Sequence, residues 1–595
     1  MKRMILLTAS LLVICGILSL HITGCGNVDL KDFIESATAK FKVGDIVYVS
    51  AYSGDDGNPG TIESPLATIQ EAIERIVNSR GRGEVRVAIG TYNVHYQGGD
   101  YIIMREGISL SGGWDLSFES RYPVDDPMYS TWVIDTSLTG TTSEPANHAL
   151  FCGDGITNAT KIDGFNFFGG YGEKSSAVRC QNGSPTITNN IFYGGLGATV
   201  ANGLVLINSS AHVYENQFYG GDSVTARGVY FEDCPAALVF ENNIVDGGDG
   251  TASSQGMYIQ QSQVTIRDNW IFGGYGPSSS GMIIIQASPY VEGNVIEGGD
   301  NAGWNNGMAI YNASPTVVFN EIYGGWGAGT TVGVYVENNA QPVVMYNVIN
   351  GGEGDSTYGV FVYGDCFPVF DGNTIDGSIG NDSHGIYVSQ SGAEIRNNEI
   401  SGGMGMGSAS FGIDLFDTVD AVYVRNNTVN GGSNNTSIGL FMGQSSNPTI
   451  QNNIIFTEGG ATQYGMYEWD TNSDPVLVVS NCLYDYTGSM YSYYDADETK
   501  SIATATDMSV DLMAEGITAA YNNNTDPGFE DIGGDDGIAG TMYDNDWHLW
   551  AAAFNVDVTD NGRDLSAIFT TDRDGTFRTG NGTDGWSMGA YELDR

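Results

Sequence analysis

Residues 281–306 read GMIIIQASPYVEGNVIEGGDNAGWNN, and residues 307–332 repeat the pattern as GMAIYNASPTVVFNEIYGGWGAGTTV. Each segment begins with a glycine and an alternating apolar strand and continues into a second short strand that contains Asn-x-apolar. Two strands with a period of two and no helical period, repeated at a fixed spacing, are typical of a β-solenoid.

The same glycine recurs at steps of 25 to 28 residues. Its positions are Gly203, Gly228, Gly256, Gly281, Gly307, Gly333, Gly359, Gly385, Gly412, Gly439 and Gly465. A propeller blade needs four strands in roughly 40 residues, whereas one such unit fits one turn of a parallel β-helix. Parallel connections are right-handed. We therefore predict an all-β, single-stranded, right-handed parallel β-helix of about 26 residues per coil.

An asparagine ladder accompanies the glycines, at steps of 25 to 29 residues. Its members are Asn190, Asn216, Asn243, Asn269, Asn294, Asn320, Asn347, Asn373, Asn398, Asn427, Asn453 and Asn481. Stacked side-chain amides can bond to neighbouring coils and to backbone groups at the corners. We expect a structural role for this row.

The residue between the two apolar positions of each Gly-apolar-x-apolar strand must face outward, because its neighbours face the core. These residues are Val205, Tyr230, Tyr258, Ile283, Ala309, Tyr335, Phe361, Tyr387, Asp414, Phe441 and Tyr467. We call the seven aromatic ones (Tyr230, Tyr258, Tyr335, Phe361, Tyr387, Phe441 and Tyr467) the aromatic stripe. The stripe could bind sugar rings or a partner, or could simply stabilise the sheet, which is the interpretation we favour. The loop aromatics Tyr275, Trp304 and Trp326 fit either role.

The two ends of the chain differ from the repeat. Ser64 and Pro65 predict a helix start, and Leu66, Ile69, Ile73, Ile76 and Val77 follow at helical spacing. An open solenoid core must be covered, so we expect this helix to cap the N-terminal end.

The first residues predict export. Lys2 and Arg3 precede the apolar stretch Ile5–Leu20, as in a signal peptide. Ile22-Thr23-Gly24-Cys25 resembles the bacterial lipobox, which implies that Cys25 becomes lipidated; a plain signal peptide and an uncleaved anchor are the alternatives. Gly26 is not the Asp that retains lipoproteins at the inner membrane. The expected location is therefore the outer membrane or cell surface of a bacterium, with a membrane contact through the lipid.

We divide the chain accordingly: 1–25 is the lipoprotein signal peptide, 26–45 a tether, 46–500 the β-helix, with 46–140 as its cap and first coils, and 501–595 a closing segment and cap. Acidic residues number 71 against 23 basic ones, for a net charge of −48. Such a surface repels polyanions, so we expect no nucleic-acid partner, and we expect a monomer.

Five cysteines remain after Cys15 and Cys25, and their wide spacing fits neither a disulfide framework nor a zinc motif. Cys152 and Cys180 lie about one coil apart, so they could stack and form a disulfide. Two buried thiols are the interpretation that we prefer.

Both ends also carry a resemblance. The run from Tyr48 through Asn58-Pro59-Gly60-Thr61 to Gln70 is similar to the opening segment of bacterial pectate-lyase-like β-helix proteins. Gly112-Gly113-Trp114-Asp115 and Trp586-Ser587-Met588-Gly589-Ala590-Tyr591-Glu592 resemble segments of surface-lipoprotein members of that group. The resemblance implies the fold and export, but not an activity, because lyases, hydrolases, epimerases and adhesins share the fold.

Catalytic motifs are absent from the sequence as far as pattern can show. Lyases of this fold combine Ca²⁺-binding acids with an Arg or Lys base. The basic residues of the regular coils are Lys161, Lys174, Arg179, Arg227, Arg267, Arg396 and Arg425, and none adjoins an acid cluster of that kind. The last three precede the asparagine ladder, and we expect them on a solvated face. We assign no catalytic residue.

Two loops suggest a metal site. Asp55 and Asp56 and, near the other end, Asp572 and Asp574 supply oxygens in glycine-containing turns, which Ca²⁺ prefers. Ordinary Asp/Gly turns explain them equally simply, and we favour that explanation. Ca²⁺ is thus the one cofactor that the sequence suggests.

The functional prediction is a lipid-anchored extracytoplasmic β-helix protein that binds or adheres without catalysis, with a carbohydrate or a surface protein as its partner. The alternatives are a Ca²⁺-assisted polysaccharide lyase or glycoside hydrolase, and a structural surface spacer.

Overall fold

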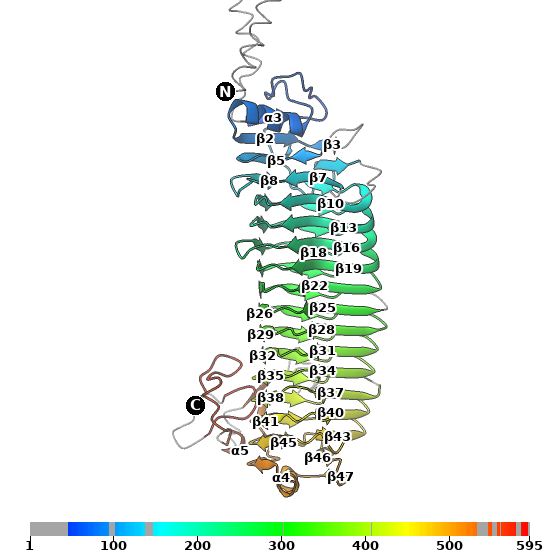
Figure 1. The fold of residues 1–595 in the computed structure, drawn as a ribbon, viewed down its shortest axis with the longest axis vertical. Helices are drawn as coiled ribbons and strands as arrows, with labels where there is room; N and C mark the ends of the chain where they lie inside the picture. Colours follow the sequence, from blue (N-terminus) through cyan, green and yellow to red (C-terminus); the bar gives the residue numbers. More distant parts are fainter. Residues whose placement is uncertain are drawn as a thin grey trace, which may run out of the picture.

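The computed structural model describes residues 46–94, 101–136, 147–300, 303–405, 407–531, 546–549, 556–559, 561–578 and 585–592. Within them the chain winds into a right-handed parallel β-solenoid of about 15 turns, which confirms the predicted fold class (Figure 1). The signal peptide, the tether and Cys25 lie outside the described residues.

Three parallel sheets form the walls. Sheet 1 has 17 strands: β1 (Ile46–Val49), β2 (Gly83–Ala88), β5 (Ile108–Trp114), β8 (Lys161–Asp163), β11 (Thr186–Thr188), β14 (His212–Tyr214), β17 (Val239–Glu241), β20 (Thr265–Arg267), β23 (Tyr290–Glu292), β26 (Thr316–Val318), β29 (Val343–Met345), β32 (Val369–Asp371), β35 (Ala393–Arg396), β38 (Val422–Arg425), β41 (Thr449–Gln451), β44 (Leu477–Val479) and β48 (Thr518–Ala520).

Sheet 2 contains the longest strands and has 16: β4 (Ile102–Ile103), β7 (Asn147–Cys152), β10 (Tyr171–Gln181), β13 (Leu196–Ile207), β16 (Asp222–Glu232), β19 (Asp249–Gln260), β22 (Ser278–Ile285), β25 (Trp304–Tyr311), β28 (Thr330–Glu337), β31 (Ser356–Tyr363), β34 (Asp382–Ser389), β37 (Ala409–Phe416), β40 (Thr436–Gly443), β43 (Thr462–Glu468), β46 (Tyr491–Asp495) and β47 (Lys500–Ile502).

Sheet 3 has 15: β3 (Gly90–Val94), β6 (Thr131–Asp135), β9 (Asn166–Phe168), β12 (Ile191–Tyr193), β15 (Gln217–Tyr219), β18 (Ile244–Asp246), β21 (Trp270–Phe272), β24 (Val295–Glu297), β27 (Glu321–Tyr323), β30 (Val348–Asn350), β33 (Thr374–Asp376), β36 (Glu399–Ser401), β39 (Thr428–Asn430), β42 (Ile454–Phe456) and β45 (Cys482–Tyr484).

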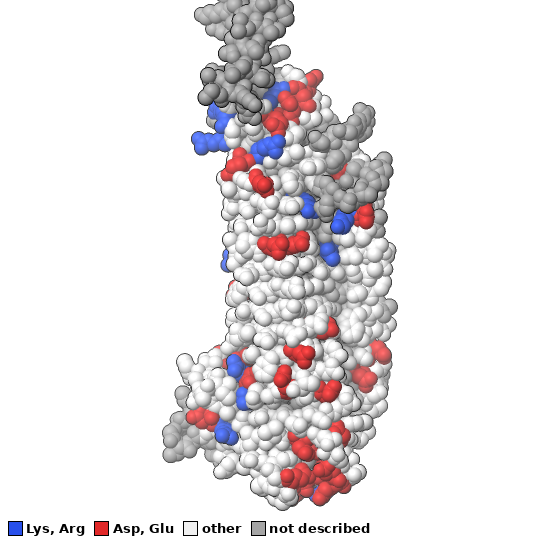
Figure 2. All heavy atoms as spheres, viewed as in Figure 1, with Lys and Arg blue, Asp and Glu red and all other residues white. Residues whose placement is uncertain are grey.

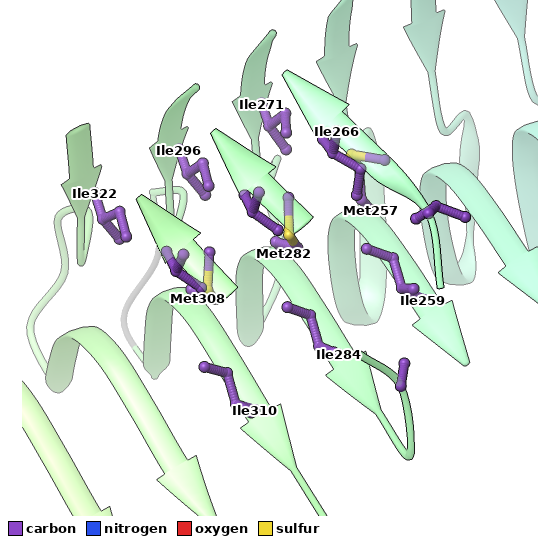
Figure 3. Packing of buried hydrophobic residues seen from close by; sticks show 14 of the residues in the cluster. Met257, Ile259, Ile266, Ile271, Met282, Ile284, Ile296, Met308, Ile310 and Ile322 are labelled. Atoms are coloured by element: carbon purple, nitrogen blue, oxygen red, sulfur yellow. The ribbon is translucent and has the colours of Figure 1, made fainter. Parts of the chain in front are cut away.

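The alternating strand of each repeat lies in sheet 2. Residues at equivalent positions of successive coils pair with one another, so side chains of the same kind form columns. Met257, Met282 and Met308 occupy paired positions on adjacent coils, and all three are fully buried (Figure 3). The repeat glycine is required by space: a Cβ on Gly281 would lie 2.7 Å from the carbonyl oxygens of both Glu297 and Gly307. No side chain fits there, which explains why glycine returns in every coil.

The asparagine ladder is structural, as predicted. The amide nitrogen of Asn320 donates to the carbonyl of Val291 at 3.0 Å and to Oδ1 of Asn347 at 3.0 Å. The Oδ1 of Asn320 accepts from the backbone N–H of Asn294 at 2.9 Å. Each side chain thus satisfies backbone groups of two coils that would otherwise be buried without partners.

The helices close the two ends of the core. Helix α3 (Ile69–Ser79) buries Ile69, Ala72, Ile73 and Ile76 against the first coils, so the predicted N-terminal cap is confirmed. Helix α4 (Ala505–Ala514) and the β46–β47 hairpin close the other end (Figure 1). No helix among the described residues has the length and apolarity that a membrane crossing needs.

The C-terminal segment differs in part from the expectation. Strand β48 continues sheet 1 to Ala520, beyond the expected limit at residue 500. After β49 (Phe529–Asp531), β50 (Asp546–Leu549) and α5 (Val556–Thr559), the chain returns along the flank of the solenoid and does not cap its end. Arg578 donates to Asn397 Oδ1 at 3.0 Å, and Asn426 donates to the Ser587 carbonyl at 3.0 Å. Asn397 and Asn426, which face outward at the corner beside the asparagine ladder, therefore hold the C-terminal segment against the solenoid.

Cys152 and Cys180 are paired neighbours in β7 and β10, and both are buried free thiols, as are the other three cysteines of the described chain. The expectation for Arg425 was wrong: it is 8% exposed. Its Nη1 donates to both carboxylate oxygens of Glu394 at 2.9 Å, and this ion pair allows the guanidinium to be buried.

Candidate functional site: a basic pocket on the outer face of sheet 2

The outer face of sheet 2 is uneven where three of its longest strands meet. In the middle strand, β13, the outward residues Val200, Asn202 and Val205 are short. Longer side chains adjoin them: Lys174 of β10 pairs with Val200, Arg227 of β16 with Asn202, and both Arg179 and Tyr230 with Val205, so a hollow remains over β13. This hollow is a pocket of about 210 Å³, lined by Lys174, Arg179, Val200, Asn202, Val205, Ile207, Arg227, Tyr230 and Glu232.

Three cations converge on this pocket in a chain that has about three acids for every base. Glu232 is the one carboxylate in its lining, so the formal charge of the lining is +3 − 1 = +2. Figure 2 shows how sparse basic side chains are over the visible face of the solenoid. A positive concave patch on an acidic protein concentrates anions locally.

Arg227 is the best-held cation of the pocket. Its Nε donates to Gln255 Oε1 at 2.7 Å, and its guanidinium carbon lies 4.2 Å from the centroid of the Tyr258 ring and 5.3 Å from that of Tyr230. Burial lowers the pKa of Arg227 from its usual value. Burial, followed by the carboxylate of Glu232, raises the pKa of Tyr230, which therefore stays a neutral hydroxyl.

The other polar groups complete a mixed lining. Arg179 Nη2 donates to Gln181 Oε1 at 3.0 Å, which orients the guanidinium. Asn202 is 8% exposed and donates to the Ser175 carbonyl at 3.3 Å, while its Oδ1 has no hydrogen-bond partner among the described residues. An unpaired buried acceptor in a pocket is a place for a ligand donor such as a hydroxyl.

A larger hollow of about 910 Å³ lies on sheet 1, where Trp114, Arg121 and Lys161 contribute to its lining. Two of its three cations are paired: Arg121 Nη2 and Lys161 Nζ lie 3.0 and 2.9 Å from the two carboxylate oxygens of Asp163. With Arg82 and Glu84 included, the formal charge of its lining is +3 − 2 = +1, below the +2 of the pocket on sheet 2.

The aromatic stripe lies on the outer face of sheet 2, and its rings contact one another. Ring centroids are 5.4 Å apart for Tyr335 and Phe361, 4.8 Å for Phe361 and Tyr387, and 5.7 Å for Phe441 and Tyr467. No member belongs to the largely exposed hydrophobic residues of the described chain. Rings that cover each other present less free face to a sugar, a geometry that favours stabilisation of the sheet. Tyr230 differs, because it also lines the basic pocket.

The loop aromatics are more accessible than the stripe. Tyr275 is 52% exposed, Trp304 37% and Trp326 58%. Trp304 packs edge-on against Tyr335 with ring centroids 5.8 Å apart. None of the three rings lines the basic pocket, although Tyr275 pairs with Asp249 of β19, the strand next to β16.

A histidine–aspartate pair interrupts the stripe. His384 Nδ1 lies 3.1 Å from Asp414 Oδ2, and both residues are less than 8% exposed. The imidazole is stacked between the rings of Tyr358 and Phe411, with centroid distances of 4.6 and 4.8 Å. Because both faces of the imidazole are covered, we interpret the pair as a buried structural contact and assign it no catalysis.

Three of the four aspartates proposed for Ca²⁺ accept hydrogen bonds from backbone N–H groups. Asp55 Oδ1 accepts from the N–H of Gly57 at 2.7 Å, and Asp56 Oδ1 accepts from the N–H groups of Ala67 and Thr68 at the start of α3. These contacts are those of ordinary turns and a helix start.

The second pair is similarly placed. Asp572 accepts from the N–H groups of Asp574, Thr576 and Glu592, and Asp574 Oδ2 lies 2.7 Å from His548 Nε2. Three metal-binding side chains come together elsewhere in the described chain, at Asp495, Glu498 and Asp511. A Ca²⁺ at either predicted pair stays an untested prediction.

Sequence patterns had shown Lys174, Arg179 and Arg227 only as scattered bases. Arg227 lies nearly two repeats after Arg179, and a bulge in the pairing of β10 with β13 shifts the register between Gly172 and Lys174. The useful signal was the pairing across coils: Lys174 and Arg179 pair with Val200 and Val205 of β13, and Arg227 pairs with Asn202, so each base adjoins a short side chain.

Comparisons with known proteins agree with the fold. Residues 251–381 and 358–525 match the family described as right handed beta helix region, and residues 52–269 match the family described as protein of unknown function (DUF1565). No curated protein is significantly similar to the chain.

Three solved structures of proteins with a carbohydrate in their name or bound to them match the chain at low identity and low TM-score. DFA-IIIase from Arthrobacter chlorophenolicus A6 without its lid, in complex with GF2, is 12% identical, with a TM-score of 0.31 over 62% of this chain and 94% of that one. The Azotobacter vinelandii mannuronan C-5 epimerase AlgE6 A-module is 14% identical, with a TM-score of 0.27 over 76% and 95%. XylC in complex with xylose is 8% identical, with a TM-score of 0.32 over 92% and 98%. None of these similarities assigns an activity to the chain.

Proposed function

This chain is a right-handed parallel β-helix protein, and we propose that it is exported, anchored through lipid on Cys25, and binds an acidic polysaccharide without cutting it. The observation that carries the proposal is the convergence of Lys174, Arg179 and Arg227 on one pocket of a strongly acidic molecule. The lipid anchor rests on the Thr23-Gly24-Cys25 sequence alone.

The mixed chemistry of the pocket supports a carboxylated sugar. Cationic groups attract a carboxylate, and guanidinium groups can bond it with two parallel hydrogen bonds. Asn202 Oδ1 and Glu232 accept hydrogen bonds, which an anion without a proton, such as sulfate, cannot donate and a sugar hydroxyl can. Val200 and Val205 provide apolar surface for the carbon-bound face of the ring.

The pocket is large enough to hold one sugar residue of a longer polysaccharide. Its volume of about 210 Å³ is below the roughly 300–1,000 Å³ of pockets that enclose drug-sized ligands. A single sugar residue would occupy it while the rest of the chain runs across the outer face of sheet 2.

Binding without cleavage follows from the acids that are present. Glycosidases generally use two carboxylates flanking the bond, whereas Glu232 is the one carboxylate in the lining. A lyase remains the second candidate because burial lowers the pKa of Arg227, which is the direction that a general base requires. The absence of a Ca²⁺-type acid cluster among the pocket-lining residues makes binding the better supported function.

The test is isothermal titration of the purified full-length chain, in detergent, with oligosaccharides of uronic acids and with neutral oligosaccharides of equal length. Acidic ligands should bind, and rising NaCl should weaken them. Replacing Arg227 with Gln, or Lys174 with Gln at the pocket rim, should weaken binding about tenfold or more, because a charged hydrogen bond contributes roughly 1.5–3 kcal/mol.

Arg267→Gln is the matched control, because Arg267 is an exposed arginine of sheet 1 that pairs with Glu241 outside the pocket. It should leave affinity unchanged. Equal affinity for neutral sugars, or unchanged affinity in both pocket variants, would refute the site. Unsaturated products released from the polymer, and lost in Arg227→Gln, would make the chain a lyase.

A further inference from the structure

At the C-terminal end of the solenoid, three acidic side chains from three successive elements meet. Asp495 ends β46, Glu498 lies in the turn before β47, and Asp511 lies on α4. One carboxylate oxygen of each lies within 4.8 Å of those of the other two. Figure 2 shows acidic side chains gathered at this end of the molecule.

The arrangement leaves buried oxygens without donors. Asp495 is 1% exposed; its Oδ1 accepts from the Glu498 N–H at 3.0 Å, but its Oδ2 has no hydrogen-bond partner in the described part of the chain. The Oδ2 of Asp511 is buried and lacks a partner in the same way. Unpaired buried carboxylate oxygens are costly, and they normally coordinate a metal or find a cation.

Lys500 compensates this charge only in part. Its ammonium lies 3.1 Å from Asp511 Oδ1 and 3.4 Å from Glu498 Oε2, on the exposed side of the cluster. Lys500 is the backbone partner of Asp495 in the β46–β47 hairpin, but among the described residues its ammonium forms ion pairs with Glu498 and Asp511 and not with Asp495. Three carboxylates and one ammonium leave −3 + 1 = −2, which is the charge that one divalent cation neutralises.

We propose that Asp495, Glu498 and Asp511 bind a Ca²⁺ ion that fastens α4 to the β46–β47 hairpin and closes the C-terminal end of the core. The spacing fits: ligands about 2.4 Å from one Ca²⁺ lie at most about 4.8 Å apart, and the three oxygens lie within that limit. Ca²⁺ accepts six to eight oxygens in flexible geometry, so water and backbone carbonyls complete the shell. A turn, a strand end and a helix can supply such a flexible set.

The site is separate from the basic pocket and does not depend on the proposed function. Its consequence is local: without the ion, like charges oppose the packing of α4 on the last coil, where Ala505, Met508 and Leu512 are buried. The ion should therefore protect this cap from opening.

Calcium chloride is titrated calorimetrically into the metal-free full-length chain, and thermal unfolding is followed with and without the ion. We expect one strong site and a melting temperature that rises with CaCl₂ but not with equal MgCl₂. Asp511→Asn keeps the shape of the side chain and should weaken Ca²⁺ binding about tenfold or more. In metal-free buffer it should be at least as stable as the parent, because it reduces the repulsion among the three carboxylates.

Glu530→Gln is the control: it removes one exposed acid from the same part of the chain and should leave Ca²⁺ binding unchanged. Absence of heat and of any thermal shift in the parent would overturn the proposal, as would an equal response to MgCl₂ or an Asp511→Asn variant that binds Ca²⁺ like the parent. Asp495→Asn provides a second, independent removal of a ligand.

Discussion

Asp376 shows how a single residue is constrained by its place in a coil. Its Oδ1 accepts from the N–H of Ser378 at 2.9 Å, at a turn where Ser378 has a φ of 66°. On neighbouring coils the same turn is held by neutral side chains: Asn350 accepts from Gly352 at 2.8 Å, and Ser401 accepts from Gly403 at 3.0 Å. The acceptor is structurally required at this corner, but its negative charge is not.

Burial raises the pKa of Asp376 to about 6 from 3.8, which makes folding depend on pH. The folded state binds the proton more tightly, so this residue is most favourable below pH 3.8, loses stability between pH 3.8 and 6, and stays unfavourable above pH 6. We predict that Asp376→Asn is more stable than the parent at pH 7, by on the order of 3 kcal/mol, with a difference that vanishes near pH 4.

Urea unfolding of both chains between pH 4 and 8 checks this. Asp365→Asn, which changes an exposed acid at a nearby turn with a φ of 57°, should show no such pH-dependent difference. A stability difference between Asp376→Asn and the parent that is constant at all pH values would show that protonation of Asp376 does not cause the pH dependence of stability.

At the scale of the element, sheet 2 combines a stacked aromatic surface with a basic pocket. Phe361 touches four rings, those of Trp304, Tyr335, Tyr358 and Tyr387. These contacts join β25, β28, β31 and β34, so the Phe361 ring stabilises the packing of adjacent coils.

We predict that Phe361→Leu lowers the free energy of unfolding by about 1–3 kcal/mol, because each aromatic pair contributes roughly 0.5–1.5 kcal/mol beyond burial. Binding of acidic oligosaccharides should not change. Urea denaturation and titration calorimetry measure the two effects, and Tyr363→Leu, a 38% exposed ring two residues away, is the control. Lost binding with unchanged stability would instead support the stripe as a sugar platform.

At the scale of the whole molecule, the acid excess is spread over the solenoid, and few bases interrupt it (Figure 2). Such a surface favours solvation of a long solenoid, and under the proposed function it would confine anion binding to the basic pocket. The N-terminal cap lies at one end of the solenoid, so a molecule anchored through its N-terminal segment would project from the membrane by the length of the solenoid (Figure 1).

We predict that Cys25→Ser moves the chain from the membrane fraction to the soluble fraction of bacterial cells that express it, since lipid on Cys25 is the proposed attachment. Cys15→Ser, within the apolar stretch, should stay with the membranes. If Cys25→Ser also stays there, the N-terminal segment is an uncleaved anchor. If the parent is itself soluble, the segment is a plain signal peptide.

The sequence by itself determined the repeat architecture. Each coil carries its own glycine, inward apolar residues and asparagine. These residues fix the same local structure in every repeat, so the architecture can be predicted even though the coils differ slightly in length. For the same reason, the N-terminal helix and the structural role of the ladder could be predicted, since Ile73 and Asn320 each follow a short-range pattern.

Only the tertiary structure decided which residues lie next to each other across coils. Coils vary in length by a few residues, so the pairing of Arg179 with Val205 and of Val205 with Tyr230 depends on turns and bulges that no periodicity fixes. The joining of Asp495 to Asp511 likewise depends on how α4 folds back under the last coil. The pocket and the carboxylate cluster each depend on the lengths and directions of side chains that come together from different coils or elements. Packing determines these contacts, and the sequence repeat does not.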